Sequence, residues 1–208
     1  MMPTARRSLA VVVACLALAT TAALRSPSPS VGAGSMQASP GASPVPTGSS
    51  ARYLPSAQDI GEGWSVVATG APEVDPAVFL DAASAVYVGP GGARVMVTAW
   101  TNLPGRTAVQ RSWEVVGGVY EDVRHDATGP KDDGREEELA ALPLPAGCVD
   151  ARRVDGTDPL FGLPGAVTQC AVDPDVTVLV VVSGSIDGVA GSAASDRVAT
   201  LAAVAGNG

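Results

Sequence analysis

Few residues of this chain have the chemistry that catalysis or metal binding requires. The sequence contains one histidine, His125, and three cysteines. Ser–His–Asp catalysis would have to use His125, but no Gly-x-Ser-x-Gly nucleophile elbow occurs in the chain. The two later cysteines have no histidine near them in the sequence, so they would make a poor zinc site. We therefore predict no catalytic residue, no metal site and no bound cofactor.

Two groups of acidic residues could belong to sites, but surface charge explains both better. Paired carboxylates can hydrolyse glycosidic bonds, and the candidates are Glu114, Glu121 and Asp122. Sugar-binding clefts are usually rich in aromatic rings, however, and the chain has only three Trp, three Tyr and two Phe. The acidic segment 125–138 does not match a calcium loop, because its carboxylates lack the Asp-x-Asp-x-Asp-Gly spacing.

Cys148 and Cys170 form an even pair in the part of the chain that can fold. Disulfides are favoured in oxidising compartments, where exported proteins reside. This pair would close a loop of about 22 residues and stabilise the fold by about 3 kcal/mol in the chain-entropy account. The spacing is far from the Cys-x-x-Cys of redox enzymes, so we predict a structural disulfide.

Residues 1–23 have the pattern of a secretory signal peptide. Two arginines precede an apolar run over 9–18, and small residues follow it. The apolar run is about ten residues long, whereas a membrane-spanning helix needs about 20. Two processing routes are open: cleavage near Ala23 releases the protein, and lipidation of Cys15 in Val-Val-Ala-Cys anchors it. The paired arginines leave both the Sec and the twin-arginine export routes open.

The next segment, 24–51, consists almost entirely of Ser, Pro, Gly and Ala. Such a segment buries too little apolar surface to offset its ordering entropy, so we expect a disordered linker. Residues 52–205 then form one globular extracytoplasmic domain of ordinary size. The net charge of −8 disfavours nucleic acid as a partner, and a lipid anchor is the one membrane contact that we expect.

Local patterns predict the secondary structure of this domain. Ser56 can cap a short helix, with Asp59 at the capping-box position. Two β-prone segments flank the glycine-rich turn 89–92, which indicates a hairpin and not a phosphate loop, because no Lys-Ser/Thr follows. The expected helices are 56–60, 77–83, 107–116, a short one ending near Leu142, and 195–204. The expected strands are 64–69, 84–88, 93–101, 119–123, 148–154, 166–172 and 176–182.

The arrangement of these elements indicates an α+β fold. The strand 176–182 is almost wholly apolar and β-branched, which predicts burial on both faces and a central place in the sheet. Val198, Leu201 and Val204 are spaced to pack as one stripe of the last helix. We predict a mostly antiparallel sheet with helices packed on one face and one disulfide.

The start of the domain carries a recognisable segment, Leu-Pro-Ser-Ala-Gln-Asp-Ile-Gly-Glu-Gly-Trp over 54–64. It resembles a segment at the start of extracytoplasmic domains in some bacterial lipoproteins and in sensor domains of bacterial serine/threonine kinases. Those families also place a Pro/Ser-rich tether after a signal or membrane anchor. The resemblance implies an envelope-exposed ligand-binding or sensor-like module, and it carries over no site residue.

The sequence therefore predicts an exported, non-enzymatic binding or sensor-like module of the cell envelope, secreted or held at the outer face of the membrane. Its partner is expected to be a small apolar ligand or another protein. A ligand cleft would be lined by Trp64, Trp100 and Phe161. Two alternatives remain: an accessory envelope protein without a small ligand, and a hydrolase that uses two facing carboxylates.

Overall fold

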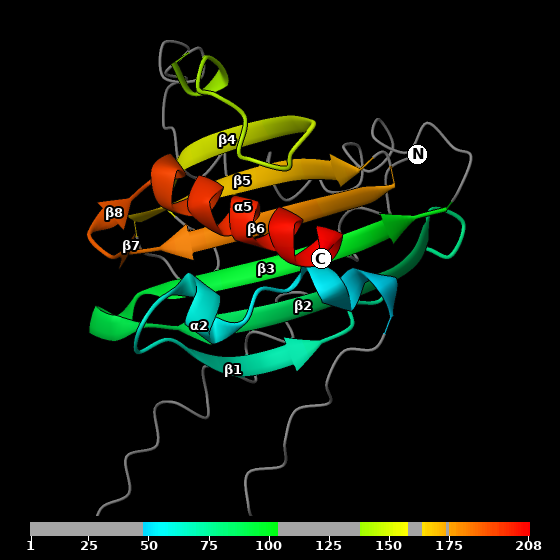
Figure 1. Ribbon diagram of the computed structural model, residues 1–208, viewed down its shortest axis with the longest axis horizontal. Coiled ribbons are helices and arrows are strands. Elements are labelled where there is room, and N and C mark those ends of the chain that lie inside the picture. Colours follow the sequence, from blue (N-terminus) through cyan, green and yellow to red (C-terminus); the bar gives the residue numbers. More distant parts are fainter. Residues whose placement is uncertain (1–47, 104–137, 158–163, 174) are drawn as a thin grey trace, which may run out of the picture.

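The computed structural model of the chain describes residues 48–103, 138–157, 164–173 and 175–208. In these ranges, strands build a sheet and helices pack against it, as Figure 1 shows. The elements in chain order are η1 (Ser49–Tyr53), α2 (Ala57–Ile60), β1 (Ser65–Gly70), β2 (Phe79–Val88), η2 (Pro90–Gly92), β3 (Arg94–Asn102), β4 (Asp150–Thr157), β5 (Pro164–Asp173), β6 (Val176–Ser183), β7 (Ser185–Ile186), β8 (Val189–Ala190) and α5 (Ser192–Asn207). The predicted signal peptide, most of the linker, the helix 107–116 and the strand 119–123 lie outside the described residues.

The main sheet has six strands in the order β1-β2-β3-β6-β5-β4, and every neighbouring pair is antiparallel. The strands β7 and β8 form a separate small hairpin. Strand β6 lies inside the main sheet between β3 and β5, and all eight of its residues are buried. Both the α+β prediction and the central place of the apolar strand are confirmed.

The hairpin of β2 and β3 forms as predicted, but β2 is longer than expected. Gly91 and Gly92 adopt positive φ angles of 68° and 81° in the turn, a conformation that glycine reaches without steric cost. The pairing of β2 with β3 runs from Val88 opposite Arg94 back to Phe79 opposite Asn102. The helix predicted over 77–83 is therefore wrong: 77 and 78 lie in a turn, and from Phe79 the ladder with β3 overrides the local preference of the alanines.

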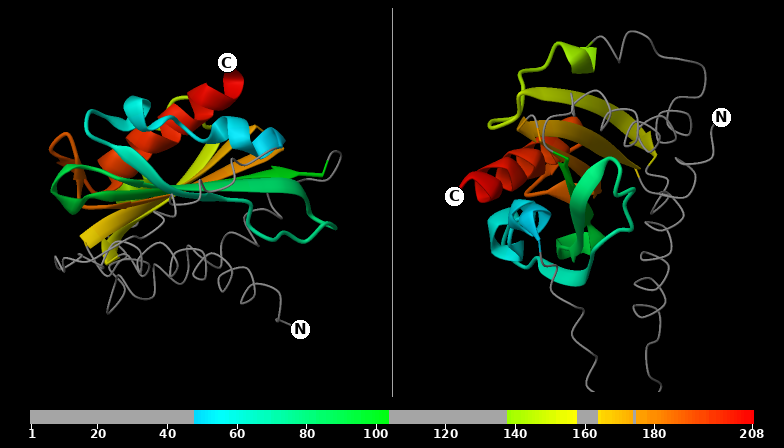
Figure 2. Two further views of the ribbon diagram at one scale, coloured as in Figure 1. Left: turned by 90° about the horizontal axis from the view of Figure 1, so that it is seen from below. Right: turned by 90° about the vertical axis from the view of Figure 1, so that its right-hand side faces the viewer.

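The sheet has two faces of different construction. Side chains of consecutive strand residues point to opposite sides. We call the side that carries η1, α2 and α5 the α5 face, and the opposite side the second face. The left-hand view of Figure 2 shows all three helices on the same side of the sheet. Apolar side chains form one buried cluster on each face.

Helix α5 packs across β5 and β6 with a surface made mostly of small residues. Its buried apolar residues include Ala194, Val198, Ala199 and Ala202, which let the helix lie close to the valines beneath it. Val198 is buried as predicted. The prediction for Val204 is wrong, because its side chain is 61% exposed. The buried stripe therefore runs through alanines, which a search for large apolar residues does not detect.

The N-terminal end of the fold is held by Asp81 of β2. Its carboxylate accepts hydrogen bonds from the backbone N–H groups of Ser49 (2.7 Å) and Ser50 (3.2 Å) and from both serine hydroxyls. The Ser50 hydroxyl also lies 2.8 Å from that of Thr101. The partly buried carboxylate of Asp81 thus binds Ser49 and Ser50 of η1, which lie on the linker side of the predicted boundary at Arg52.

The short helix α2 begins as the sequence predicts. Ser56 and Asp59 form a capping box, in which each side chain bonds the backbone N–H of the other residue. Among the described residues, no helix is both long and apolar enough to cross a membrane.

Candidate ligand-binding face

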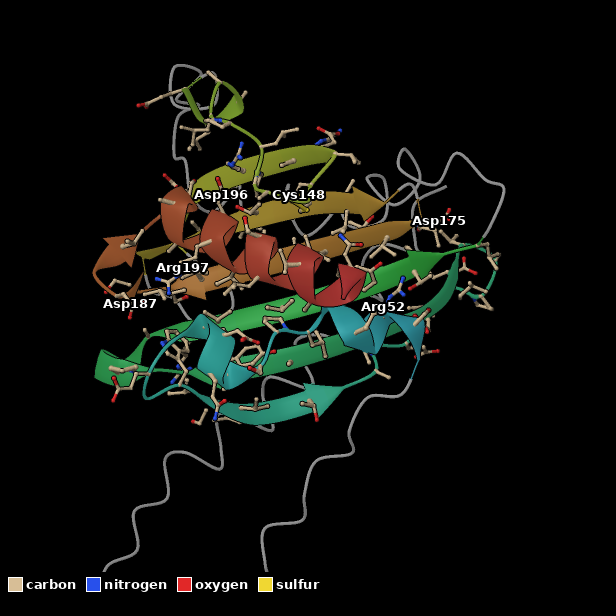
Figure 3. All side chains as sticks on the ribbon, in the orientation of Figure 1. Arg52, Cys148, Asp175, Asp187, Asp196 and Arg197 are labelled. Atoms are coloured by element: carbon tan, nitrogen blue, oxygen red, sulfur yellow. A yellow bond between two sulfur atoms is a disulfide. The ribbon has the colours of Figure 1, made fainter. Side chains whose placement is uncertain are left out.

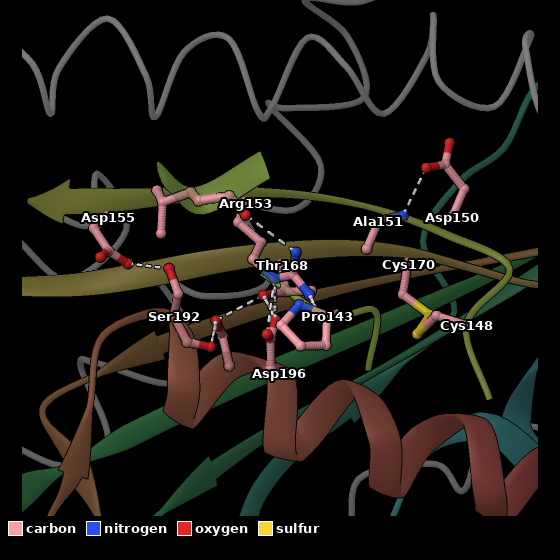
Figure 4. Close-up of polar contacts among 12 residues, drawn as sticks. Pro143, Cys148, Asp150, Ala151, Arg153, Asp155, Thr168, Cys170, Ser192 and Asp196 are labelled. Atoms are coloured by element: carbon pink, nitrogen blue, oxygen red, sulfur yellow. Dashed lines mark hydrogen bonds and ion pairs between the residues drawn. A yellow bond between two sulfur atoms is a disulfide. The ribbon is translucent and has the colours of Figure 1, made fainter. Parts of the chain in front are cut away.

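The polar side chains on the α5 face are paired with one another. Arg153 of β4 donates from Nε to both carboxylate oxygens of Asp196 on α5, each at 2.8 Å, and from its other nitrogens to the carbonyls of Leu139 and Pro143. Thr168 of β5 donates to the same carboxylate at 2.8 Å and lies 2.7 Å from the Ser195 hydroxyl. Figure 4 shows this cluster between the sheet and α5. A buried charge is tolerated when it is paired and hydrogen-bonded in this way.

The disulfide also lies on the α5 face. Cys148 and Cys170 are joined with an S–S distance of 2.04 Å and a Cα–Cα distance of 5.7 Å, which confirms the predicted pair. Cys170 is fully buried and belongs to the cluster beneath α5. The bond therefore ties the segment that precedes β4 to the middle of β5 (Figure 4).

A more exposed ion pair lies at the edge of this face. Arg197 of α5 lies 2.8 Å from Asp187, and both side chains are partly exposed. Figure 3 shows the two residues together at the end of the sheet where β7 and β8 lie. Arg197 also donates to the carbonyl of Ile60, which links α5 to the end of α2.

Three adjacent rows of side chains cross the middle of the second face, and a fourth row with Ser183, Arg94 and Val88 lies beside the row that contains Met96. The pairing of the strands places one residue from each of β4, β5, β6, β3 and β2 in every row. The first row is apolar: Val154, Val167, Val181, Met96 and Val86. The middle row is partly polar: Arg152, Gln169, Leu179, Thr98 and Ser84. The third row is Asp150, Ala171, Thr177, Trp100 and Ala82.

The polar atoms of this face are only partly satisfied. In the middle row, the hydroxyls of Thr98 and Ser84 bond each other at 3.0 Å. Gln169 is fully buried, and neither its Oε1 nor its Nε2 has a hydrogen-bond partner. At the end of β3, Asn102 bonds the carbonyl of Asp175 through Nδ2, but its buried Oδ1 has no partner. An unpaired buried polar group costs about 1–3 kcal/mol, so each of these atoms is a specific feature to explain.

All three unpaired buried atoms of the described residues lie on the second face. Gln169 shares this face with Val167 through the alternation of β5, and Asn102 shares it with Trp100 through that of β3. The row positions next to Gln169 on β4 and β6 are Arg152 and Leu179. In these three rows, charged residues occur only on the edge strand β4, and Arg94 of β3 lies on the same face in the row beside Met96.

The three residues of the predicted cleft do not meet in the described structure. Trp64 packs on the α5 face, where a Cβ on Gly89 would lie 2.4 Å from its ring. Trp100 belongs to the cluster of the second face, together with Met96 and Leu179. Phe161 lies outside the described residues. The two tryptophans are thus on opposite faces of the sheet, and Trp100 is the one that shares a face with the unpaired amides.

Sequence reasoning missed Gln169 and Asn102. The signal for Gln169 was present, since it is a large polar residue inside the strand that alternates over 166–172. The carboxylate candidates Glu114, Glu121 and Asp122 and the lone His125 lie outside the described residues. Within the described ranges, no group of three or more His, Cys, Asp or Glu side chains could hold a metal ion.

The α5 face also contains a strongly perturbed phenol. Burial and the negative charge of Asp59 raise the pKa of Tyr87 well above its usual range. Its hydroxyl donates to the carbonyl of Pro55 at 2.7 Å, so the neutral phenol holds the start of α2 against β2. This residue has a structural role and takes no part in the second face.

Comparisons with known proteins add no assignment, because no family model, no curated protein and no solved structure matches the chain.

Proposed function

We propose that the chain is an exported, non-enzymatic binding module of the cell envelope, which holds a small apolar ligand against the second face of its sheet. The observation that carries the proposal is the second apolar cluster on the side of the sheet opposite α5. It contains Phe79, Met96, Trp100 and Leu179, all buried. The elements η1, α2 and α5 lie on the other side of the sheet, so this cluster is separate from the one that they cover (Figure 2).

Three further features support the proposal. The disulfide is typical of proteins that work in an oxidising compartment. The N-terminal segment has the pattern of an export signal followed by a flexible tether. Ligand sites for small molecules are mostly apolar with a few placed polar groups, and the second face has this composition.

Tryptophan quenching tests the proposal directly, because each face carries one buried tryptophan among the described residues. The probe is 10-bromo-1-decanol, an uncharged chain whose bromine quenches a tryptophan only at close range. In a Trp113→Phe background, the variant Trp64→Phe keeps Trp100, and the variant Trp100→Phe keeps Trp64. We expect saturable quenching in the first variant and little quenching in the second.

These variants are matched controls, since both tryptophans are 8% exposed and each substitution is conservative. Equal quenching of the two variants would show that the probe does not bind selectively at the second face. No saturable quenching in either variant would favour an accessory envelope protein that has no small ligand.

A further inference from the structure

The two edges of the main sheet differ in charge. Strand β1 lies at one edge and β4 at the other, and among the described strands each has a neighbour in the sheet on one side only (Figure 1). Charged side chains on an edge strand hinder pairing with another chain. The six residues of β1, Ser-Val-Val-Ala-Thr-Gly, carry no charge. The eight residues of β4 include Asp150, Arg152, Arg153 and Asp155.

Strand β1 is also accessible where it begins. Ser65, Val66 and Val67 are all exposed, and the two valines are 46% and 47% exposed. The register with β2 shifts by one residue between Val66 and Ala68, as in a β-bulge. A bulge bends a strand, so this edge suits one short partner strand better than an open-ended stack of sheets. The β-branched valines offer apolar contacts to such a strand.

The segment that contains β1 is acidic. Glu62 and Glu73 are exposed and lie shortly before and shortly after β1, and among the described residues neither forms an ion pair. From residue 53 to residue 93 the chain contains no Lys, Arg or His, and its charged residues there are Asp59, Glu62, Glu73, Asp75 and Asp81.

The basic residues of neighbouring elements have partners of their own. Arg94 lies on β3, two strands away from β1, and has an interaction of its own. Arg52 of η1 packs on the ring of Tyr53 and bonds its hydroxyl. Arg197 of α5 is paired with Asp187. The carboxylates on either side of β1 therefore dominate the charge at this edge.

We propose that the exposed edge of β1 binds an extended segment of a partner protein, in which basic residues flank a short, uncharged, β-prone stretch. A segment added to a sheet edge gains affinity from main-chain hydrogen bonds. Basic residues at its two ends lie near Glu62 and Glu73, which speeds encounter and selects against acidic segments. This surface is separate from the second face, so the proposal does not depend on a ligand there.

A second copy of this chain fits the edge less well. Antiparallel pairing of two β1 strands about their centre places Ser65 of one copy opposite Gly70 of the other. The same pairing brings Glu62 of one copy toward Glu73 of the other at both ends of the strands. Like charges that face each other across paired strands are unfavourable, and the net charge of −8 on each copy adds repulsion.

The test uses three fluorescent peptides of equal length. The first is Arg-Arg-Thr-Val-Thr-Val-Thr-Arg-Arg. The second has Glu in place of every Arg, and the third has Pro in place of the central Thr, which removes an N–H and disfavours pairing inside a ladder. Binding to the oxidised, exported chain is measured by fluorescence anisotropy. We expect the first peptide to bind roughly tenfold more tightly than either of the others.

Substitutions at the two edges localise the binding. Glu62→Gln and Glu73→Gln each remove one flanking carboxylate, and each should weaken binding of the first peptide about threefold. The matched control is Asp150→Asn, which removes an exposed carboxylate at the β4 edge and should leave the affinity unchanged. In a ¹H–¹⁵N spectrum, the first peptide should move the amide signals of residues 65–68 and leave those of β4 in place.

Four results would overturn the proposal. Equal binding of the proline-containing peptide would show attraction by charge without strand pairing. Signals that move on β4 and not on β1 would place the peptide at the other edge. Concentration-dependent shifts at 65–68 in the chain alone would make a second copy the occupant. The fourth result is that none of the three peptides binds. Each of these results leaves the tryptophan-quenching test of the second face unaffected.

Discussion

The buried polar side chains on the two faces of the sheet differ in whether they have hydrogen-bond partners. On the α5 face, Arg153 and Thr168 both bond Asp196, and Asp81 bonds the two serines that begin the fold. On the second face, Gln169 of the same strand as Thr168 has no partner for either side-chain atom. The polar groups of the α5 face bond one another, and the second face keeps three unpaired polar atoms among buried apolar side chains of the described residues. The difference is consistent with the proposal that the second face, and not the α5 face, takes part in binding.

The largest loss of stability is expected when the α5 face loses Asp196, the counter-charge of Arg153. The variant Asp196→Ala leaves the guanidinium of Arg153 buried without its carboxylate, which should lower the free energy of unfolding by about 3–5 kcal/mol. Urea unfolding followed by circular dichroism measures the loss. The control is Asp187→Ala, which removes an exposed ion pair with Arg197 and should cost less than about 1 kcal/mol. Similar losses in the two variants would show that burial of the Arg153 pair is unimportant.

The disulfide is the next largest contribution to the α5 face. Replacing Cys148 and Cys170 together by alanine should lower the free energy of unfolding by about 3 kcal/mol, because the unfolded chain regains the entropy of the closed loop. Thermal unfolding of the double variant beside the oxidised wild type measures this loss. The variant should keep its affinity for apolar probes where it is folded, since the bond lies on the α5 face and the proposed ligand face is the opposite one. A loss of probe binding at temperatures where the variant is folded would break the separation between the faces.

A smaller effect is expected at the N-terminal cluster of the α5 face. Burial raises the pKa of Asp81, but the hydrogen bonds from Ser50 and Ser49 outweigh burial, so the pKa lies below the ordinary value of 3.8. The folded state therefore gains stability from the ionised carboxylate above pH 3.8, and this gain is lost as the pH falls through the lowered pKa.

The variant Asp81→Asn checks this pH dependence. We expect it to be less stable than the wild type near neutral pH, with the difference narrowing as the pH falls below 4. Unfolding in urea at a series of pH values measures the change. A difference that is constant over this range would show that ionised Asp81 does not hold η1.

Sequence reasoning reached the features that local pattern controls. The apolar run of β6, the capping box of Ser56 and the turn 89–92 each depend on neighbouring residues, and all three appear in the structure. The disulfide could be predicted from the sequence, because only two cysteines lie in the part of the chain expected to fold. The same reasoning failed at 79–83, where pairing with β3 decides between helix and strand.

The residues of the candidate site could not be predicted from local patterns, because the register of the strands decides which residues share a face. Arg153 and Asp196 are 43 residues apart in sequence, and nothing local shows that they pair. Thr168 and Gln169 are adjacent polar residues on one strand. The side chain of Thr168 has hydrogen-bond partners, and that of Gln169 has none. Only the placement of α5 over one face of the sheet separates them.

The adjacent pair Thr168 and Gln169 offers the most direct test of the difference between the faces. In the ligand-free chain, Thr168→Val should lower the free energy of unfolding by about 1–3 kcal/mol, because Asp196 and Ser195 lose a buried partner. The variant Gln169→Met should leave the free energy of unfolding unchanged or raise it by about 1 kcal/mol, because an unpaired amide is replaced by an apolar group of similar length. Urea unfolding of both variants beside the wild type measures the two changes. If Gln169→Met destabilises the ligand-free chain as much as Thr168→Val does, the amide already has a partner in the fold, and the second face is a closed core like the first.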